Sequence, residues 1–181
     1  MELSRLWIGS LRYLWSNWRY RRSIKVSPIE TKIWCPTAIE ELNEWLQWAY
    51  SRFVWTMDSY TSLWDVMDTP SSCLYSIVNT NTILRDDCDG FHAAVLEAVR
   101  HIDGCEAQLL TYVTTPIRFS HTVLVVKCND KYLLIDYDVC TSYRNVADIV
   151  CFINRENDVL AMEFSQYSPE KGWYTGWKIE I

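Results

Sequence analysis

The chain has 181 residues, with a hydrophobic fraction of 49% and a charged fraction of 22%, and these values are typical of one globular domain. The net charge of −6 excludes nucleic-acid binding by bulk positive charge. No apolar run approaches the roughly 20 residues that a transmembrane helix needs. No secretory signal is recognised, because Arg12 interrupts the apolar run at residues 6–14.

Seven cysteines are scattered along the chain without the CxxC spacing of zinc sites. Their odd number, and the apolar neighbours of Cys128 and Cys151, are typical of reduced, intracellular thiols. We therefore expect a cytoplasmic protein without a disulfide framework.

Residues 1–26 are predicted to form a basic amphipathic helix. Residues 2–25 carry a charge of +5, which leaves −11 for the rest of the chain. Leucine and tryptophan recur there at helical spacing: Leu3, Leu6, Trp7, Leu11, Leu14, Trp15 and Trp18. Either this helix packs on the acidic body, the usual role of such a stripe, or it contacts a partner, a membrane surface or nucleic acid. We favour packing, with residues 27–181 as a single domain and no nucleic acid bound by that body.

Helices are predicted before strands in the remaining chain. A capping box of Thr37 and Glu40 begins a helix of about five turns that ends near Phe53. A less regular segment follows at 55–68, then a short helix at 73–78 and a helix at 88–103 that Gly104 ends. Strands are expected at 107–115, 120–128, 131–137, 159–167 and 173–181, while 146–154 fits helix or strand. Helices followed by an antiparallel sheet indicate the α+β class.

Cys88 lies at the predicted start of a helix, among three carboxylates. The unpaired amides and the dipole of a helix start favour the thiolate, which is the nucleophilic form. Asp86, Asp87 and Asp89 oppose it, because like charges raise the pKa of a thiol. A thiolate there needs a cation, for which His121 is the natural candidate.

His121 begins a strand that a turn at Asn129-Asp130 joins to the next strand. If this turn has two residues, His121 lies opposite Asp138, and Asp136 is its diagonal neighbour on the same face. Tyr137 is then expected to point to the other face. Burial favours Asp136 as the carboxylate that orients His121, whereas the register alone favours Asp138. A slip of one residue would exchange the faces.

Each of these residues also has a simpler structural interpretation. A cysteine at a helix start is most often a small core residue, and Asp86 or Asp87 is most often a helix N-cap. His92, four residues after Cys88, competes with His121 as the partner of the thiol. The order of cysteine, strand histidine and strand aspartate is the pattern that favours catalysis.

Three segments resemble the transglutaminase-like superfamily, nearest to the bacterial transglutaminase-like cysteine peptidases: Asp87-Cys88-Asp89-Gly90-Phe91, Ser120-His121-Thr122-Val123 and Leu133-Leu134-Ile135-Asp136. The resemblance covers about residues 60–140, and the spacings of 33 and 15 residues between its key positions fit the family. It implies a papain-like α+β fold in which the nucleophile helix packs on an antiparallel β-sheet. It also implies a triad of Cys88, His121 and Asp136 and acyl transfer through a thioester.

The chain departs from the family pattern in three places. Arg85-Asp86 stands where glycine or an aromatic residue is frequent, Gly90 replaces the usual second acid, and no tryptophan follows His121. Because acids beside the cysteine bind calcium in some relatives, the resemblance makes Asp87 and Asp89 candidate calcium ligands. No other cofactor is expected.

We therefore expect a cysteine hydrolase, a peptidase or amidase that acts on a protein or peptide. Two alternatives remain open: a catalytically inactive transglutaminase-like binding module that uses the basic N-terminus, and a transglutaminase or deamidase acting on glutamine. The amide of Cys88 would be one oxyanion donor. The second donor is open among four side chains: Trp64, Tyr75, Asn79 and Asn81.

Overall fold

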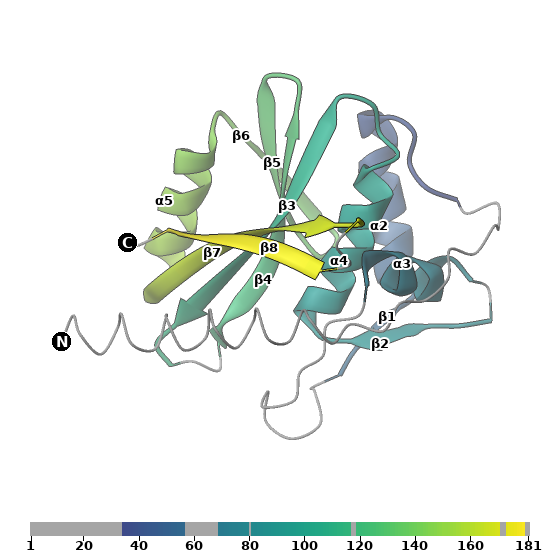
Figure 1. Cartoon of the computed structure of the whole chain (residues 1–181), viewed down its shortest axis with the longest axis horizontal. Helices are drawn as coiled ribbons and strands as arrows, with labels where there is room; N and C mark the ends of the chain where they lie inside the picture. The colour runs from purple at the N-terminus through teal and green to yellow at the C-terminus, as the bar shows by residue number, and fades with distance from the viewer. Residues whose placement is uncertain (1–33, 57–68, 80, 117–118, 171–172, 180–181) are drawn as a thin grey trace.

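The computed structural model describes residues 34–56, 69–79, 81–116, 119–170 and 173–179 (Figure 1). The helix predicted for residues 1–26, most of the segment at 55–68 and Trp64 lie outside these residues. The helices are η1 (Ile39–Glu41), α2 (Leu42–Tyr50), α3 (Pro70–Val78), α4 (Cys88–Val99) and α5 (Val146–Glu156). The strands are β1 (Phe53–Trp55), β2 (Leu84–Asp86), β3 (Cys105–Thr114), β4 (His121–Cys128), β5 (Lys131–Asp136), β6 (Val139–Tyr143), β7 (Val159–Ser168) and β8 (Trp173–Ile179).

The predicted α+β class is confirmed. Within the described residues, six strands form one antiparallel sheet in the order β6-β5-β4-β3-β7-β8. The short strands β1 and β2 form a separate parallel pair. Helix α4 lies against β3 and β4, with α3 beside it, while α5 lies on the other side of the sheet (Figure 1).

Two hydrophobic clusters hold the helices to the sheet, because neighbouring residues of a strand point to opposite faces. Leu109 belongs to the cluster under α2, α3 and α4, together with the fully buried Phe91. Its neighbour Leu110 belongs to the cluster under α5, together with Ile149 and Ile153. The sheet is therefore covered on both faces, and α4 has a fixed position against β4.

Two helix ends differ from the prediction. The helix predicted to reach Phe53 ends at Tyr50, because Phe53 begins β1. The expected partner of Thr37 was Glu40, but the main-chain N–H of Thr37 donates to Glu41 Oε2 over 2.8 Å. The reason is that residues 39–41 form a tighter 3₁₀ turn before α2 begins.

The helix predicted for 88–103 ends at Val99, four residues earlier than expected. Gly104 then follows in the turn before β3, with a left-handed φ of 74°. The ambiguous segment at 146–154 is helical, because Asn145 Oδ1 accepts the Asp148 N–H over 2.9 Å and caps the helix.

The predicted register of the β4–β5 hairpin is confirmed, with Cys128 paired to Lys131 and Leu124 to Ile135. The strand β6 was not predicted. It follows β5 after Tyr137 and Asp138 alone, so that Asp136 pairs with Val139. This early reversal ends β5 at Asp136, close to the start of β4.

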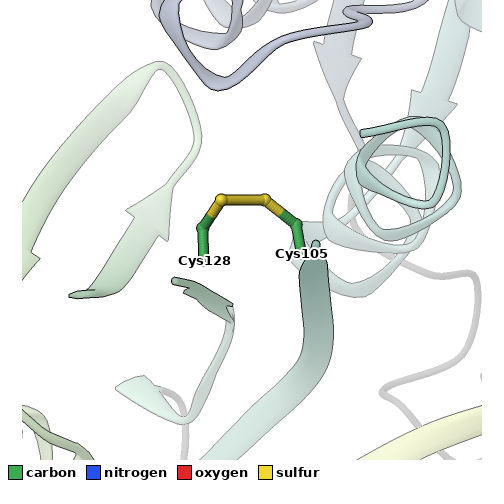
Figure 2. Close-up of a disulfide and its surroundings, with 2 residues drawn as sticks. All are labelled: Cys105 and Cys128. Carbon is green, nitrogen blue, oxygen red and sulfur yellow. A yellow bond between two sulfur atoms is a disulfide. The ribbon is translucent and has the colours of Figure 1, made fainter. Parts of the chain in front are cut away.

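The expectation that the cysteines form no disulfide is wrong for Cys105 and Cys128. These residues are directly paired across β3 and β4, with Cα atoms 4.3 Å apart, and their sulfur atoms are bonded (Figure 2). Opposed residues of an antiparallel pair approach to the distance that a disulfide needs. The separation of 23 residues between these cysteines in the sequence does not indicate that they pair. The other five cysteines remain thiols, including Cys88.

No helix among the described residues combines the length and the apolar character needed to cross a bilayer.

Candidate active site

Cys88 is the first residue of α4, as predicted. Asp87 is the N-cap, and its Oδ1 accepts the main-chain N–H of Asp89 over 3.0 Å, so the structural interpretation of this aspartate is confirmed. Asp86 Oδ1 in turn accepts the N–H of Asp87 over 2.9 Å. Two of the three carboxylates therefore order the chain that leads into α4.

The surroundings of the Cys88 thiol disfavour an isolated thiolate. Burial raises the pKa of this thiol most, and the charges of Asp87 and Asp89 raise it further. The main-chain N–H and the hydroxyl of Thr122 donate to the sulfur and lower the pKa, but the net change is upward. A reactive thiolate therefore requires a cation that forms together with it.

Thr122 is a site residue that sequence reasoning missed. It follows His121 on β4 and is buried. Its hydroxyl also shares a hydrogen bond of 2.9 Å with the hydroxyl of Thr111, its partner across β3 and β4. The sequence did offer one indication of this role, because Thr122 directly follows the candidate histidine. Alternation along the strand, however, assigns Thr122 to the opposite face from His121.

His121 and Asp136 are brought together by the ends of two neighbouring strands. The distance between His121 Nε2 and Asp136 Oδ1 is 2.8 Å. This hydrogen bond uses Nε2 and leaves Nδ1 of the ring for a further partner. Asp138 is exposed in the turn between β5 and β6, so the alternative that Asp138 holds His121 is wrong. The physical reason is that the chain reverses before Asp138 can pair with β4.

The carboxyl of Asp136 is prepared to carry a negative charge. Burial alone raises its pKa, but the hydrogen bond and the charge of His121, with a smaller effect of His92, outweigh burial. The net pKa of Asp136 is therefore lowered, and this carboxylate stabilises a positive charge on His121.

The structure places the Cys88 thiol close to β4 without a hydrogen bond to His121. Within the residues that the structure describes, the donors to its sulfur belong to Thr122, the residue after His121. The helix start and the histidine strand are thus adjacent at this end of the sheet. Catalytic hydrogen bonds are often long before substrate binds.

His92 does not compete with His121 as a base. Its side chain has no exposed surface, its Nδ1 lies 2.6 Å from the carbonyl oxygen of Cys88, and its Nε2 lies 3.0 Å from the main-chain nitrogen of Tyr137. Both ring nitrogens are therefore used. Burial first, and the charge of His121 second, lower the pKa of His92 to about 4.

Tyr137 was expected to point to the strand face opposite His121, and it does pack against the cluster that contains Ile135. Its ring nevertheless borders His121, which was not expected. Its φ of 55° is left-handed, because it lies in the tight turn after β5. Its ring centroid lies 5.5 Å from that of His121 and 5.2 Å from that of His92. The turn conformation, which a strand pattern does not reveal, brings this ring back to the site.

A second tyrosine borders His121 from β3. Tyr112 is the cross-strand partner of His121, and the two rings are nearly perpendicular, with centroids 5.9 Å apart. Burial, followed by the charges of Asp136 and Cys88, raises the pKa of Tyr112 to about 12. The same three causes raise the pKa of Tyr137. Both phenols therefore keep their proton at neutral pH and can donate hydrogen bonds.

Gly90, which stands where the family has a second acid, has a steric role. A Cβ atom at this position would overlap the carboxylate of Asp86. The absence of a side chain at Gly90 therefore allows Asp86 to lie against the first turn of α4, where it accepts the N–H of Asp87.

The carboxylates of Asp86, Asp87 and Asp89 have ligand atoms within 4.8 Å of one another. The resemblance made Asp87 and Asp89 candidate calcium ligands. However, calcium takes six to eight oxygen ligands, and two of these carboxylates already accept main-chain N–H groups. The helix start accounts for Asp86 and Asp87, and we derive no step through calcium.

Three of the four candidates for the second oxyanion donor are tied to one another at the end of α3. Asn79 Nδ2 donates to the hydroxyl of Tyr75 over 2.7 Å, and Asn79 Oδ1 accepts the N–H of Asn81 over 3.0 Å. The fourth candidate, Trp64, lies outside the described residues.

Comparison of the chain with protein-family models, curated proteins and solved structures gives no match. The transglutaminase-like resemblance therefore stays a prediction that rests on the three sequence segments.

Proposed function

We propose that this protein is a cysteine hydrolase, a peptidase or amidase that cleaves a protein or peptide through a thioester. The observation that carries the proposal is the hydrogen bond between His121 and Asp136, since the ring of His121 also lies 5.9 Å from that of His92 on α4. It leaves Nδ1 of His121 as the nitrogen that would accept the Cys88 proton. The sheet order and the helix on β3 and β4 support a papain-like or transglutaminase-like arrangement.

In the proposed reaction, His121 Nδ1 takes the thiol proton as Cys88 Sγ attacks the carbonyl carbon of the substrate. Asp136 stabilises the imidazolium that forms. The carbon–nitrogen bond breaks as His121 gives its proton to the leaving amine, and a thioester remains on Cys88. Water then attacks the thioester and loses a proton to His121, the carbon–sulfur bond breaks, and Cys88 regains a proton.

The raised pKa of the thiol is compatible with this cycle. Burial and the two aspartates disfavour a free thiolate, but they do not oppose a thiolate that forms next to a new imidazolium. Thr122 donates two hydrogen bonds to the sulfur. The amide of Cys88, at the start of α4, is the proposed oxyanion donor.

A catalytically inactive binding module is the second candidate, and the raised pKa of Cys88 is the observation that favours it. The two candidates predict different thiol chemistry. If Cys88 forms an ion pair with His121, its alkylation persists at low pH; an ordinary thiol has a pKa of about 8.5 and reacts slowly below it.

The deciding experiment is iodoacetamide labelling of Cys88 as a function of pH, followed by mass spectrometry of the Cys88 peptide. We expect the His121→Ala protein to be labelled at least about 300-fold more slowly than wild type at pH 6, because about one part in 300 is ionised for an ordinary thiol of pKa about 8.5 and the surroundings of Cys88 raise its pKa further. The matched control is His101→Ala, since His101 is exposed in the turn after α4. Equal labelling rates in wild type and His121→Ala would rule out the hydrolase.

Hydrolysis and acyl transfer share the thioester, so a separate measurement distinguishes them. A labelled primary amine is added while a protein mixture is incubated with the enzyme. Hydrolysis leaves the amine free, whereas its incorporation into a glutamine side chain would identify a transglutaminase instead. Release of ammonia without incorporation or peptide cleavage would identify a deamidase.

The cytoplasmic location also stays a prediction, and the disulfide removes the thiol argument for it. Disulfides persist mainly in oxidising compartments. Alkylation of intact cells, followed by mass spectrometry of Cys105, tests the location. A reduced Cys105 would agree with the cytoplasm, and a fully oxidised one would contradict it.

A further inference from the structure

His92 is a buried titratable side chain that the proposed reaction does not use. It is fully buried in the first turns of α4. Burying an imidazole costs free energy unless both of its nitrogens find partners. Here they do: the Cys88 carbonyl oxygen lies 2.6 Å from Nδ1, and the Tyr137 main-chain nitrogen lies 3.0 Å from Nε2.

These two partners determine where the ring proton lies. A carbonyl oxygen only accepts, so Nδ1 must carry the hydrogen and donate it. A main-chain N–H only donates, so Nε2 must be bare and accept. Of the three forms of imidazole, only the neutral form with hydrogen on Nδ1 makes both bonds.

The partners belong to two separate parts of the candidate site. Cys88 carries the nucleophile at the start of α4, and Tyr137 directly follows Asp136, which holds His121. One ring therefore connects the main chain of the nucleophile to the main chain beside the orienting acid. His92 and Tyr137 are 45 residues apart along the chain.

We propose that neutral His92 is a positioning residue that fixes the distance between the nucleophile helix and the turn that follows Asp136. The connection itself is independent of the reaction. Its consequence for Cys88 reactivity rests on the proposed function.

The charges around His92 agree with a neutral ring. Burial first, and His121 at the start of β4 second, disfavour protonation, and together they outweigh the Cys88 carbonyl, Asp136 at the end of β5 and Asp89 on the same helix, which favour it. The neighbouring ring in the β5–β6 turn, Tyr137, is an uncharged phenol at neutral pH. A second cation 5.9 Å from the ring of His121 would also oppose the imidazolium that catalysis needs.

The first test is a ¹⁵N NMR measurement of the histidine side chains in the wild-type protein. We expect His92 to show a protonated Nδ1 and a bare Nε2, with no titration near the ordinary pKa of 6.5. A proton on Nε2, or a titration near pH 6.5, would overturn the proposal. This measurement does not depend on activity, so it remains decisive even if His121→Ala disproves the hydrolase.

The second test uses two variants that each retain half of the connection. His92→Asn keeps a donor toward the Cys88 carbonyl, and His92→Gln keeps an acceptor that reaches the Tyr137 N–H. His101→Gln is the matched control on an exposed histidine. Amide hydrogen exchange of Tyr137 and the pH profile of Cys88 labelling are measured in all three.

We expect Tyr137 to exchange about 10-fold faster in His92→Asn but near the wild-type rate in His92→Gln, because only the second variant keeps the acceptor. Both variants should slow Cys88 labelling about 10-fold relative to His101→Gln, since each loosens the placement of the nucleophile. Exchange and labelling equal to the control in both variants would overturn the positioning role. If either variant fails to fold, the NMR result on the wild type decides.

Discussion

The two ends of the β3–β4 pair are held in opposite ways. At one end, Cys105 and Cys128 face each other and are joined by a covalent bond. At the other end, the opposed residues are Tyr112 and His121, whose rings are in contact and which no covalent bond joins. The same antiparallel pairing thus supports a disulfide at one end and a group of polar, ionisable side chains at the other.

The difference arises from the neighbouring strand. Beside Cys128, β5 begins at once and continues the sheet. Beside His121, β5 has already ended at Asp136, and the turn at Tyr137 lies where further pairing would be. Polar side chains therefore lie together where β5 ends early. The turn after Asp136 and helix α4 contribute the residues that surround them.

The largest expected effect concerns the covalent end. Replacing both Cys105 and Cys128 with serine should lower the free energy of unfolding by about 3 kcal/mol, because the unfolded chain loses a loop constraint. Urea unfolding measures this, with the exposed Cys151→Ser as control. Labelling of Cys88 at neutral pH should be unchanged. A fall in labelling would show that the two ends are coupled.

The next effect concerns acid at the site end. The pKa of His92 in the folded protein is about 4, below its ordinary 6.5, so the unfolded chain binds this proton more readily. Its contribution to stability is complete above about pH 6.5 and is lost as pH falls toward about 4. At pH 5 the loss is about 2 kcal/mol. Urea unfolding at pH 7 and pH 5 checks this, and His92→Gln should lack this part of the pH dependence.

A smaller effect separates the two candidate aspartates. Asp136→Asn removes the charge that stabilises protonated His121, so we expect Cys88 labelling at pH 6 to fall about 10-fold. Asp138→Asn is the matched control and should leave the rate unchanged, because Asp138 is exposed in the turn. Equal effects of the two substitutions would contradict the hydrogen bond as the source of orientation.

The smallest effect tests the steric role of Gly90. Gly90→Ala should destabilise the protein by about 1 kcal/mol, since the new methyl group displaces the carboxylate of Asp86. Thermal or urea unfolding measures the loss. A double-mutant cycle with Asp86→Ala should give a smaller loss for the second substitution. Additive losses would mean that the two positions do not interact.

Local patterns predicted much of the fold. The helix at Cys88, the strands on either side of Asn129-Asp130 and the register between them follow from periodicity and turn chemistry, which act over a few residues. The short strand β6 and the shortened helix α2 did not follow, because each depends on which neighbour the chain meets. Phe53 fits the apolar face of a helix equally well, yet it pairs with Leu84 in a parallel strand pair.

The candidate site divides in the same manner. Cys88, His121 and Asp136 were singled out from sequence by a helix start and a hairpin, and the structure brings His121 and Asp136 into contact. Thr122, Tyr112 and Tyr137 were missed, since their proximity to the site depends on α4 packing and on a left-handed turn. His92 was seen but given the wrong role. Its buried position and its two partners come from elements that are distant in the chain.

The sequence by itself determined the α+β class, the start of helix α4 at Cys88 and the register that brings His121 within reach of Asp136. These features rest on interactions between residues close in the chain. Only the tertiary structure decided that Asp136 rather than Asp138 holds His121, that Cys105 and Cys128 are bonded, and that His92 connects Cys88 to the turn after Asp136. Each of these features depends on how elements that are distant in the chain lie beside one another, and no local sequence pattern determines that arrangement.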